Sequence, residues 1–171
     1  FFHAYKFTHF SKEKNDDKEN DDKPALLKKV GVLLTGIDND RPENKTVPTT
    51  PYQTVKLQSN KEIEGWLIPR DSSKGAEILF HGYGGEKSSM LDKAEVFYHL
   101  GYRVLLMDFM GSGGSEGNQT TIGFHESEQV KTSFEYLQGI GEQSIHLFGT
   151  SMGAVAIMKA VHDYRLQPAS I

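Results

Sequence analysis

The residues best suited to chemistry in this sequence are a serine and its small neighbours, Gly149-Thr150-Ser151-Met152-Gly153. They follow an apolar run, 145–148, and precede a helix-forming run. In that context G-x-S-x-G marks a nucleophile on a tight strand-to-helix turn. Such a turn leaves no room for bulk two residues before or after the serine, and glycine fills both places. We therefore expect Ser151 to present its hydroxyl near the unpaired N–H groups that begin the helix.

A second glycine-rich segment, His81-Gly82-Tyr83-Gly84-Gly85, follows the apolar residues 78–80. Its glycines allow the backbone to fold back toward the nucleophile. By position, the backbone N–H groups of Tyr83 and Met152 are expected to hold the oxyanion of a tetrahedral intermediate. One such donor is typically worth about 2.7 to 4 kcal/mol of transition-state stabilisation. His81 is interpreted as a buried hydrogen-bonding residue that fixes the loop.

The elements that must position these residues follow a β-α-β-α-β-α order. Strands are expected at 77–80, 103–108 and 145–148, and helices at 88–100, 122–138 and 152–164. The strands are short and almost wholly apolar, which is typical of a parallel sheet covered on both faces. Before them, alternating residues at 52–58 and 62–68 predict an antiparallel pair of strands. The expected fold class is α/β, with a mostly parallel sheet and an antiparallel N-terminal hairpin.

Three motifs in this order resemble those of the serine α/β-hydrolase superfamily, in particular its prolyl-oligopeptidase-like and serine-aminopeptidase-like branch. They are the two segments above and, between them, Asp108-Phe109-Met110-Gly111-Ser112-Gly113-Gly114-Ser115. The resemblance covers residues 51–171 and implies an α/β-hydrolase fold. In that family the middle motif shapes the pocket floor. The resemblance therefore implies a structural role for four residues of this motif, Asp108, Gly111, Gly113 and Ser115. Met110 and Ser112 stand where many members have arginine and histidine.

The resemblance implies a serine hydrolase that cleaves an ester, thioester or amide bond through an acyl-enzyme on Ser151. The family's catalytic acid and histidine follow later strands, and the sequence ends about 20 residues after Ser151. We therefore expect a fold truncated after the nucleophile helix and a fragment that is inactive alone. His162 and Asp163 are not substitutes, because they lie roughly 16 to 18 Å from the serine along the helix axis. Glu126 is interpreted as a helix-capping carboxylate.

Other functions are less well supported by the sequence. A non-catalytic α/β-hydrolase-fold module that binds a ligand or partner is the main alternative. Dinucleotide and P-loop binding are disfavoured, because Lys87 and Glu116 occupy the third glycine position of G-x-G-x-x-G and no G-K-S/T follows. No cluster of ligands predicts a metal, and the formal charge of −4 without a basic stripe disfavours nucleic acid. We expect no cofactor, and a small molecule or peptide as substrate.

The residues before the hydrolase-like region divide into two parts. Residues 1–23 combine an aromatic-rich stub with a charged linker, and residues 24–50 combine a short amphipathic helix, 24–36, with an extended connection. The stub fits either the end of a signal or anchor helix or a plain terminal segment. The first interpretation predicts a membrane-anchored or exported protein, tethered upstream of residue 1, and the second predicts a cytoplasmic one. The compartment, the oligomeric state and the substrate stay open.

Overall fold

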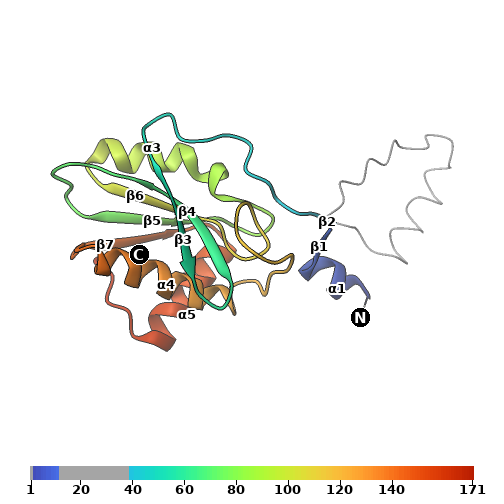
Figure 1. Ribbon diagram of the computed structural model, residues 1–171. Coiled ribbons are helices and arrows are strands. Elements are labelled where there is room, and N and C mark those ends of the chain that lie inside the picture. The colour runs from blue at the N-terminus through green and yellow to red at the C-terminus, as the bar shows by residue number, and fades with distance from the viewer. Residues whose placement is uncertain (1, 12–38) are drawn as a thin grey trace.

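The computed structural model describes residues 2–11 and 39–171 (Figure 1). The helix expected at 24–36 and residues 12–23 of the expected charged linker lie outside the described residues. The described chain forms a five-stranded sheet in the order β3-β4-β6-β5-β7. Its strands are β3 (Gln53–Gln58), β4 (Glu62–Ile68), β5 (Ala76–Phe80), β6 (Arg103–Met107) and β7 (Ile145–Gly149).

The sheet combines a parallel part with an antiparallel hairpin, and both were expected from the sequence. β3 and β4 are antiparallel, and β4 is also antiparallel to β6. β5 lies between β6 and β7 and is parallel to both. The loops after these three parallel strands therefore lie at the same edge of the sheet. Each of the three loops carries one of the three motifs.

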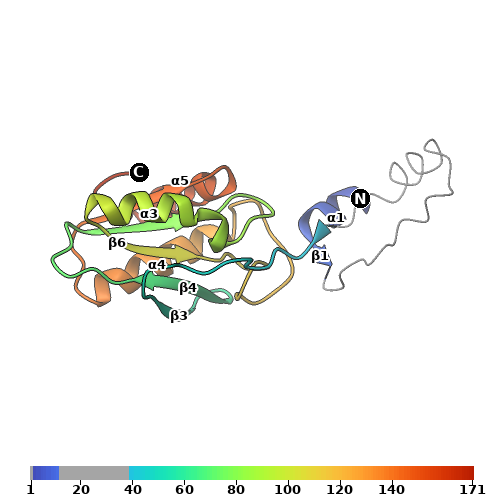
Figure 2. The same ribbon diagram turned by 90° about the horizontal axis from the view of Figure 1, so that it is seen from above.

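Helices cover both faces of the sheet (Figures 1 and 2). The 3-10 turn η1 (Lys87–Met90) and helix α3 (Leu91–Leu100) lie on one face, and helices α4 (Glu126–Gly139) and α5 (Met152–Tyr164) lie on the other. A hydrophobic core lies on each face of the sheet. Successive residues of β5 contribute to the two cores in turn, because side chains alternate across a strand. Leu79 packs on the α3 side, and Phe80 packs on the α4 and α5 side. Burial on both faces explains why the parallel strands are almost wholly apolar.

Helix α4 begins at Glu126, four residues later than the expected start at Ile122. Ile122 and Gly123 have φ values of 55° and 97°, and a left-handed backbone cannot continue a right-handed helix. Residues 122–125 therefore form a turn ahead of the helix. The expected start was wrong because the apolar spacing of Ile122 fits a helix, and spacing carries no information about the sign of φ.

The N-terminal residues add a helix and a short parallel pair of strands at the edge where the parallel strands end (Figures 1 and 2). Helix α1 (Phe2–Thr8) leads into β1 (Phe10–Ser11), which pairs with β2 (Asn39–Asp40). Among residues 2–11 and 39–171, no helix is long and apolar enough to cross a membrane.

The sheet continues past β7. The Ala169 N–H donates to the Ile145 carbonyl at 2.7 Å, and the Leu147 N–H donates to the Ser170 carbonyl at 3.1 Å. A parallel bridge between His146 and Ser170 shows that these last residues run in the same direction as β7.

Candidate active site

Ser151 occupies the sharp turn between β7 and α5. Its φ of 51° and ψ of −111° lie in a region that non-glycine residues rarely adopt. Three backbone hydrogen bonds hold the turn: from Thr150 N–H to the Phe80 carbonyl (3.1 Å), from Gly153 N–H to Thr150 (2.9 Å) and from Val155 N–H to Ser151 (3.1 Å). Ser151 itself is exposed. In the described chain, the serine on this strained turn is therefore in contact with solvent.

Two glycines make this turn possible. A Cβ atom on Gly149 would lie 2.5 Å from the carbonyl carbon of Gly153, and one on Gly153 would lie 2.5 Å from the Phe80 carbonyl oxygen. Atoms that are not bonded do not approach so closely, so a larger residue at either place would push α5 away from the sheet. The spacing of the G-x-S-x-G motif thus follows from how closely the helix packs on β7 and on the end of β5.

The loop after β5 lies against the same turn. A Cβ atom on Gly82 would lie 3.6 Å from the Ser151 Cβ, so the backbone at Gly82 borders this serine. The Gly85 N–H donates to the Gly82 carbonyl at 3.1 Å and closes a turn around Tyr83. Met152 begins α5 directly after Ser151 and is buried. The three site residues singled out from the sequence, Ser151, Tyr83 and Met152, therefore come from two segments that meet, the loop after β5 and the turn into α5.

His81 supports the loop after β5 from inside the protein. Its ring is fully buried. The Phe109 N–H donates to Nε2 at 3.1 Å, and Nδ1 lies 2.8 Å from the Gly82 carbonyl oxygen. A neutral ring with its hydrogen on Nδ1 satisfies both contacts, and burial lowers the pKa of His81, which favours that form. These contacts agree with the structural role assigned to His81.

The N-terminal segment, residues 2–11, contacts two loops at this edge of the sheet. The Tyr83 hydroxyl donates to the Phe7 carbonyl at 2.7 Å, and the two rings stack with their centroids 4.5 Å apart. The Phe10 ring lies 6.0 Å from the same tyrosine. The Thr120 N–H donates to the Thr8 carbonyl at 2.9 Å. The segment therefore links the loop that borders Ser151 to the chain that follows the middle motif.

A buried charge cluster lies under the loop after β6. Lys87 and Asp108 are both fully buried, and the Lys87 Nζ lies 2.5 Å from Asp108 Oδ2 and 2.9 Å from Glu64 Oε1. Asp108 also accepts hydrogen bonds from the N–H groups of Lys87 (2.6 Å) and Gly114 (2.9 Å) and from the Asn44 amide (2.9 Å). Asp108 thus holds the middle motif in place, the structural role that the resemblance implies. Lys87 and Asn44 are structural residues that the sequence analysis missed.

Arg41 is a further residue that the sequence analysis missed. Its guanidinium donates to four carbonyl oxygens of the loop after β6: Gly113 (2.8 Å), Ser115 (2.5 Å), Gly117 (3.3 Å) and Ser112 (3.4 Å). Arg41 lies in the segment expected to be an extended connection, more than 70 residues before its partners. The partners of Arg41 in the part of the chain that the structure describes are carbonyl oxygens. Every residue has a carbonyl oxygen, so no local sequence pattern points to this role.

Glu126 stabilises the turn that precedes its helix. It is fully buried. Its Oε1 accepts from the Thr121 N–H (2.8 Å) and the Thr120 hydroxyl (2.6 Å), and its Oε2 accepts from the Gly123 N–H (2.9 Å) and the Thr121 hydroxyl (2.5 Å). The capping interpretation placed this carboxylate at the first turn of α4. The structure shows that it instead accepts hydrogen bonds from residues that precede α4.

The other titratable candidates lie away from the turn at Ser151. His162 and Asp163 are exposed near the end of α5 and contact each other at 2.7 Å. His146 lies within β7 and contacts the hydroxyl oxygens of Ser144 (3.2 Å) and Ser170 (2.7 Å). Within the described part of the chain, no group of three or more His, Cys, Asp or Glu residues is placed to hold a metal ion.

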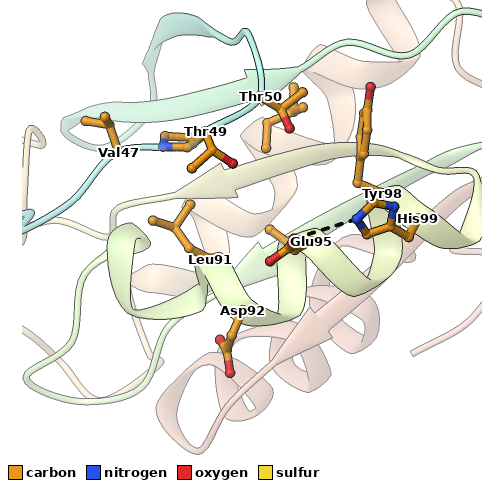
Figure 3. Close-up of a pocket in the computed structure, with 11 residues that line it drawn as sticks. Val47, Thr49, Thr50, Leu91, Asp92, Glu95, Tyr98 and His99 are labelled. Atoms are coloured by element: carbon orange, nitrogen blue, oxygen red, sulfur yellow. Dashed lines mark ion pairs between the residues drawn. The ribbon is translucent and has the colours of Figure 1, made fainter.

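A pocket of about 160 Å³ lies elsewhere, between residues 47–50 and α3 (Figure 3). Apolar side chains, including Val47 and Leu91, line it together with the Glu95–His99 pair, whose charged atoms are 3.6 Å apart. The loops that carry Ser151 and Tyr83 do not contribute to it. This pocket is therefore separate from the candidate active site.

Comparison with known proteins gives sequence relatives for much of the chain. The serine aminopeptidase S33 family matches residues 71–170. An uncharacterized protein of Mycobacterium tuberculosis is 32% identical over 124 residues, which cover 69% of this chain and 43% of that protein. A 2-hydroxy-6-oxononadienedioate/2-hydroxy-6-oxononatrienedioate hydrolase of Pseudomonas sp. is 29% identical over 108 residues, which cover 60% of this chain and 38% of that protein.

A solved structure is similar over the same region. The esterase Pf2001 of Pyrococcus furiosus has a TM-score of 0.64 and 29% identity, over 70% of this chain and 51% of the esterase. The chain thus spans about half, or less, of the length of the relatives it matches.

Proposed function

Because this chain belongs to the serine aminopeptidase S33 family of α/β hydrolases, we propose that it carries the nucleophile of a serine hydrolase. The enzyme would cleave an ester, thioester or amide bond through an acyl-enzyme on Ser151. The family and the α/β-hydrolase fold are those expected from the sequence. The observation that carries the proposal is the positive φ of Ser151, 51°, on an exposed turn beside Gly82. Backbone strain of this kind persists where surrounding structure holds it, and it concentrates at active sites.

In the proposed reaction, the Ser151 Oγ attacks the carbonyl carbon of the substrate and loses its proton to a histidine. We place that histidine and its acidic partner beyond residue 171, in the order typical of this fold. The tetrahedral intermediate collapses, the bond to the leaving group breaks, and the histidine returns its proton to that group. Water then attacks the acyl-enzyme by the same two steps, which release the acid and restore Ser151.

Two backbone N–H groups are candidates for stabilising the oxyanion. Gly153 and Val155 use their N–H groups to close the turn, whereas within residues 39–171 those of Tyr83 and Met152 donate to no backbone carbonyl. The Met152 N–H also lies at the N-terminus of α5, where the helix dipole favours negative charge. Each donor would contribute about 2.7 to 4 kcal/mol to transition-state stabilisation.

An ester is the first substrate class to test, because a structural relative is an esterase. The natural full-length protein would be treated with a fluorophosphonate probe, which labels an activated serine, and assayed with p-nitrophenyl esters. We expect labelling and hydrolysis, and the loss of both in Ser151→Ala. The matched control is Ser72→Ala: Ser72 is also exposed with a φ of 53°, but it lies in the turn between β4 and β5.

Labelling that persists in Ser151→Ala would refute the assignment of the nucleophile. A folded full-length protein that neither reacts with the probe nor hydrolyses esters would instead favour the alternative function, a non-catalytic binding module with the same fold.

A further inference from the structure

Ile122 adopts a backbone conformation that is unfavourable for its residue type. Its φ is 55°, in the left-handed region, where a side chain branched at Cβ crowds the backbone. Glycine or asparagine would adopt the same conformation with less strain. The isoleucine is not fully buried in return, because 40% of it remains exposed. Burial of this side chain therefore gives no full account of why isoleucine occupies the turn.

The surrounding residues hold Ile122 in this conformation. The Ile122 N–H donates to the Thr120 hydroxyl oxygen at 3.2 Å. On either side, the N–H groups of Thr121 and Gly123 donate to the buried Glu126 carboxylate at 2.8 and 2.9 Å. A buried carboxylate requires such donors, so the turn and the carboxylate stabilise each other. The strain at Ile122 is thus fixed by the fold.

The turn that carries Ile122 packs on the first turn of α5, directly after Ser151. The Thr120 hydroxyl lies 3.1 Å from the Met152 sulfur. A Cβ atom on Gly123 would lie 2.9 Å from a methyl group of Val155. Val155 is four residues after Ser151 and therefore lies on the same face of the helix. Thr120 and Gly123, which flank Ile122, therefore contact residues one and four places after Ser151, and this places the turn beside the start of α5.

We propose that Ile122 is a specificity-determining residue, which forms an apolar wall for the acyl group of the substrate beside Ser151. The proposal rests on the proposed function and deepens it by naming a substrate class, esters with an apolar acyl chain of several carbons. Val155, which is 50% exposed, extends the apolar surface along the helix face that presents Ser151. A fixed backbone holds the Cβ atom of the isoleucine at one position, as selection by chain length requires.

The experiment compares p-nitrophenyl octanoate with p-nitrophenyl acetate in the natural full-length protein. The variant is Ile122→Asn, because asparagine accepts the left-handed backbone and removes the apolar wall. We expect the octanoate-to-acetate ratio of kcat/KM to fall about tenfold, while Tm stays the same or rises. The control is Val96→Asn on α3, which changes an equally β-branched residue, 56% exposed, on the opposite face of the sheet. It should leave the ratio unchanged.

An unchanged ratio would overturn the proposal. If it came with an equal loss on both esters or with a lower Tm, the result would show that Ile122 only supports the fold. Fluorophosphonate labelling of the same samples separates the two proposals. If the wild-type protein is not labelled, the proposed function fails and this inference fails with it. If labelling is normal but the ratio does not change, only the role of Ile122 is refuted.

Discussion

Replacing Lys87 by methionine would remove the ammonium that faces Asp108 beneath the loop after β6. Both side chains are 0% exposed, and Nζ lies 2.5 Å from the carboxylate. Methionine keeps most of the side-chain volume, and it removes the ammonium together with its cation–π contact to the Trp66 ring, 4.4 Å away. The change therefore removes the charge with little change in packing volume. Breaking a buried ion pair by removing one partner typically costs about 3 to 5 kcal/mol, because the other charge stays buried and unpaired.

The lower end of that range is expected here. Asp108 keeps three other hydrogen-bond donors, the N–H groups of Lys87 and Gly114 and the Asn44 amide, at 2.6, 2.9 and 2.9 Å. These donors partly stabilise its charge, so we expect Lys87→Met to lower the free energy of unfolding by about 3 kcal/mol. Adding Asp108→Asn removes the uncompensated charge that is fully buried, whereas the Glu64 carboxylate is 20% exposed. The double variant should therefore be more stable than the sum of the two single changes by about 2 kcal/mol.

Urea unfolding of the full-length protein, followed by tryptophan fluorescence, measures these differences. The matched control is Lys56→Met, which breaks a pair with Glu62 of similar length, 2.9 Å, whose side chains are 57% and 39% exposed. Exposed pairs contribute little, so this variant should unfold like the wild-type protein. A Lys87→Met variant as stable as Lys56→Met, or strictly additive losses in the double variant, would refute the argument that burial makes this pair critical.

Two further predictions each concern one side chain, Tyr83 and Glu77. Tyr83→Phe removes the 2.7 Å hydrogen bond to the Phe7 carbonyl, which is worth about 1 kcal/mol. Amide exchange in residues 2–11 should therefore become roughly fivefold faster. Exchange at the wild-type rate would show that ring stacking alone holds the segment. Burial raises the pKa of Glu77 from 4.5 to about 7, so the folded state binds the extra proton and stability should fall as pH rises between those values. Glu77→Gln should flatten that part of the profile in urea unfolding at several pH values, and an unaltered slope would contradict the assignment.

Local patterns were sufficient to predict the elements of this fold that repeat regularly. The observed bounds of β5, β6 and β7 differ from the expected ranges by no more than one residue at either end, because burial on both faces leaves a continuous apolar signal. The turn at Ser151 was also foreseen, since the glycines at 149 and 153 are required by contacts of 2.5 Å. Contacts as close as these allow only glycine, so the requirement can be recognised in the sequence.

The missed features depend on contacts between residues far apart in the chain. Arg41 binds carbonyl oxygens, which every residue has, so its partners are not visible in the sequence. Lys87 was considered only as a break in a glycine pattern, and nothing local indicates that it is buried against Asp108. Ile122 was assigned to a helix because its apolar character fits one, whereas its backbone is set by Glu126 through side-chain hydrogen bonds. Spacing cannot report such tertiary constraints.

The docking of residues 2–11 also bears on the order in which the protein folds. This segment is synthesised before its partners, yet its hydrogen bond from Tyr83 spans 76 residues, and its bridge from His9 reaches Gln119. Closing loops of that size loses chain entropy that only a nearly finished partner surface can offset. Residues 2–11 are therefore expected to dock after their partners have folded, so that the turn at Ser151 forms before this segment packs against the loop that carries Tyr83.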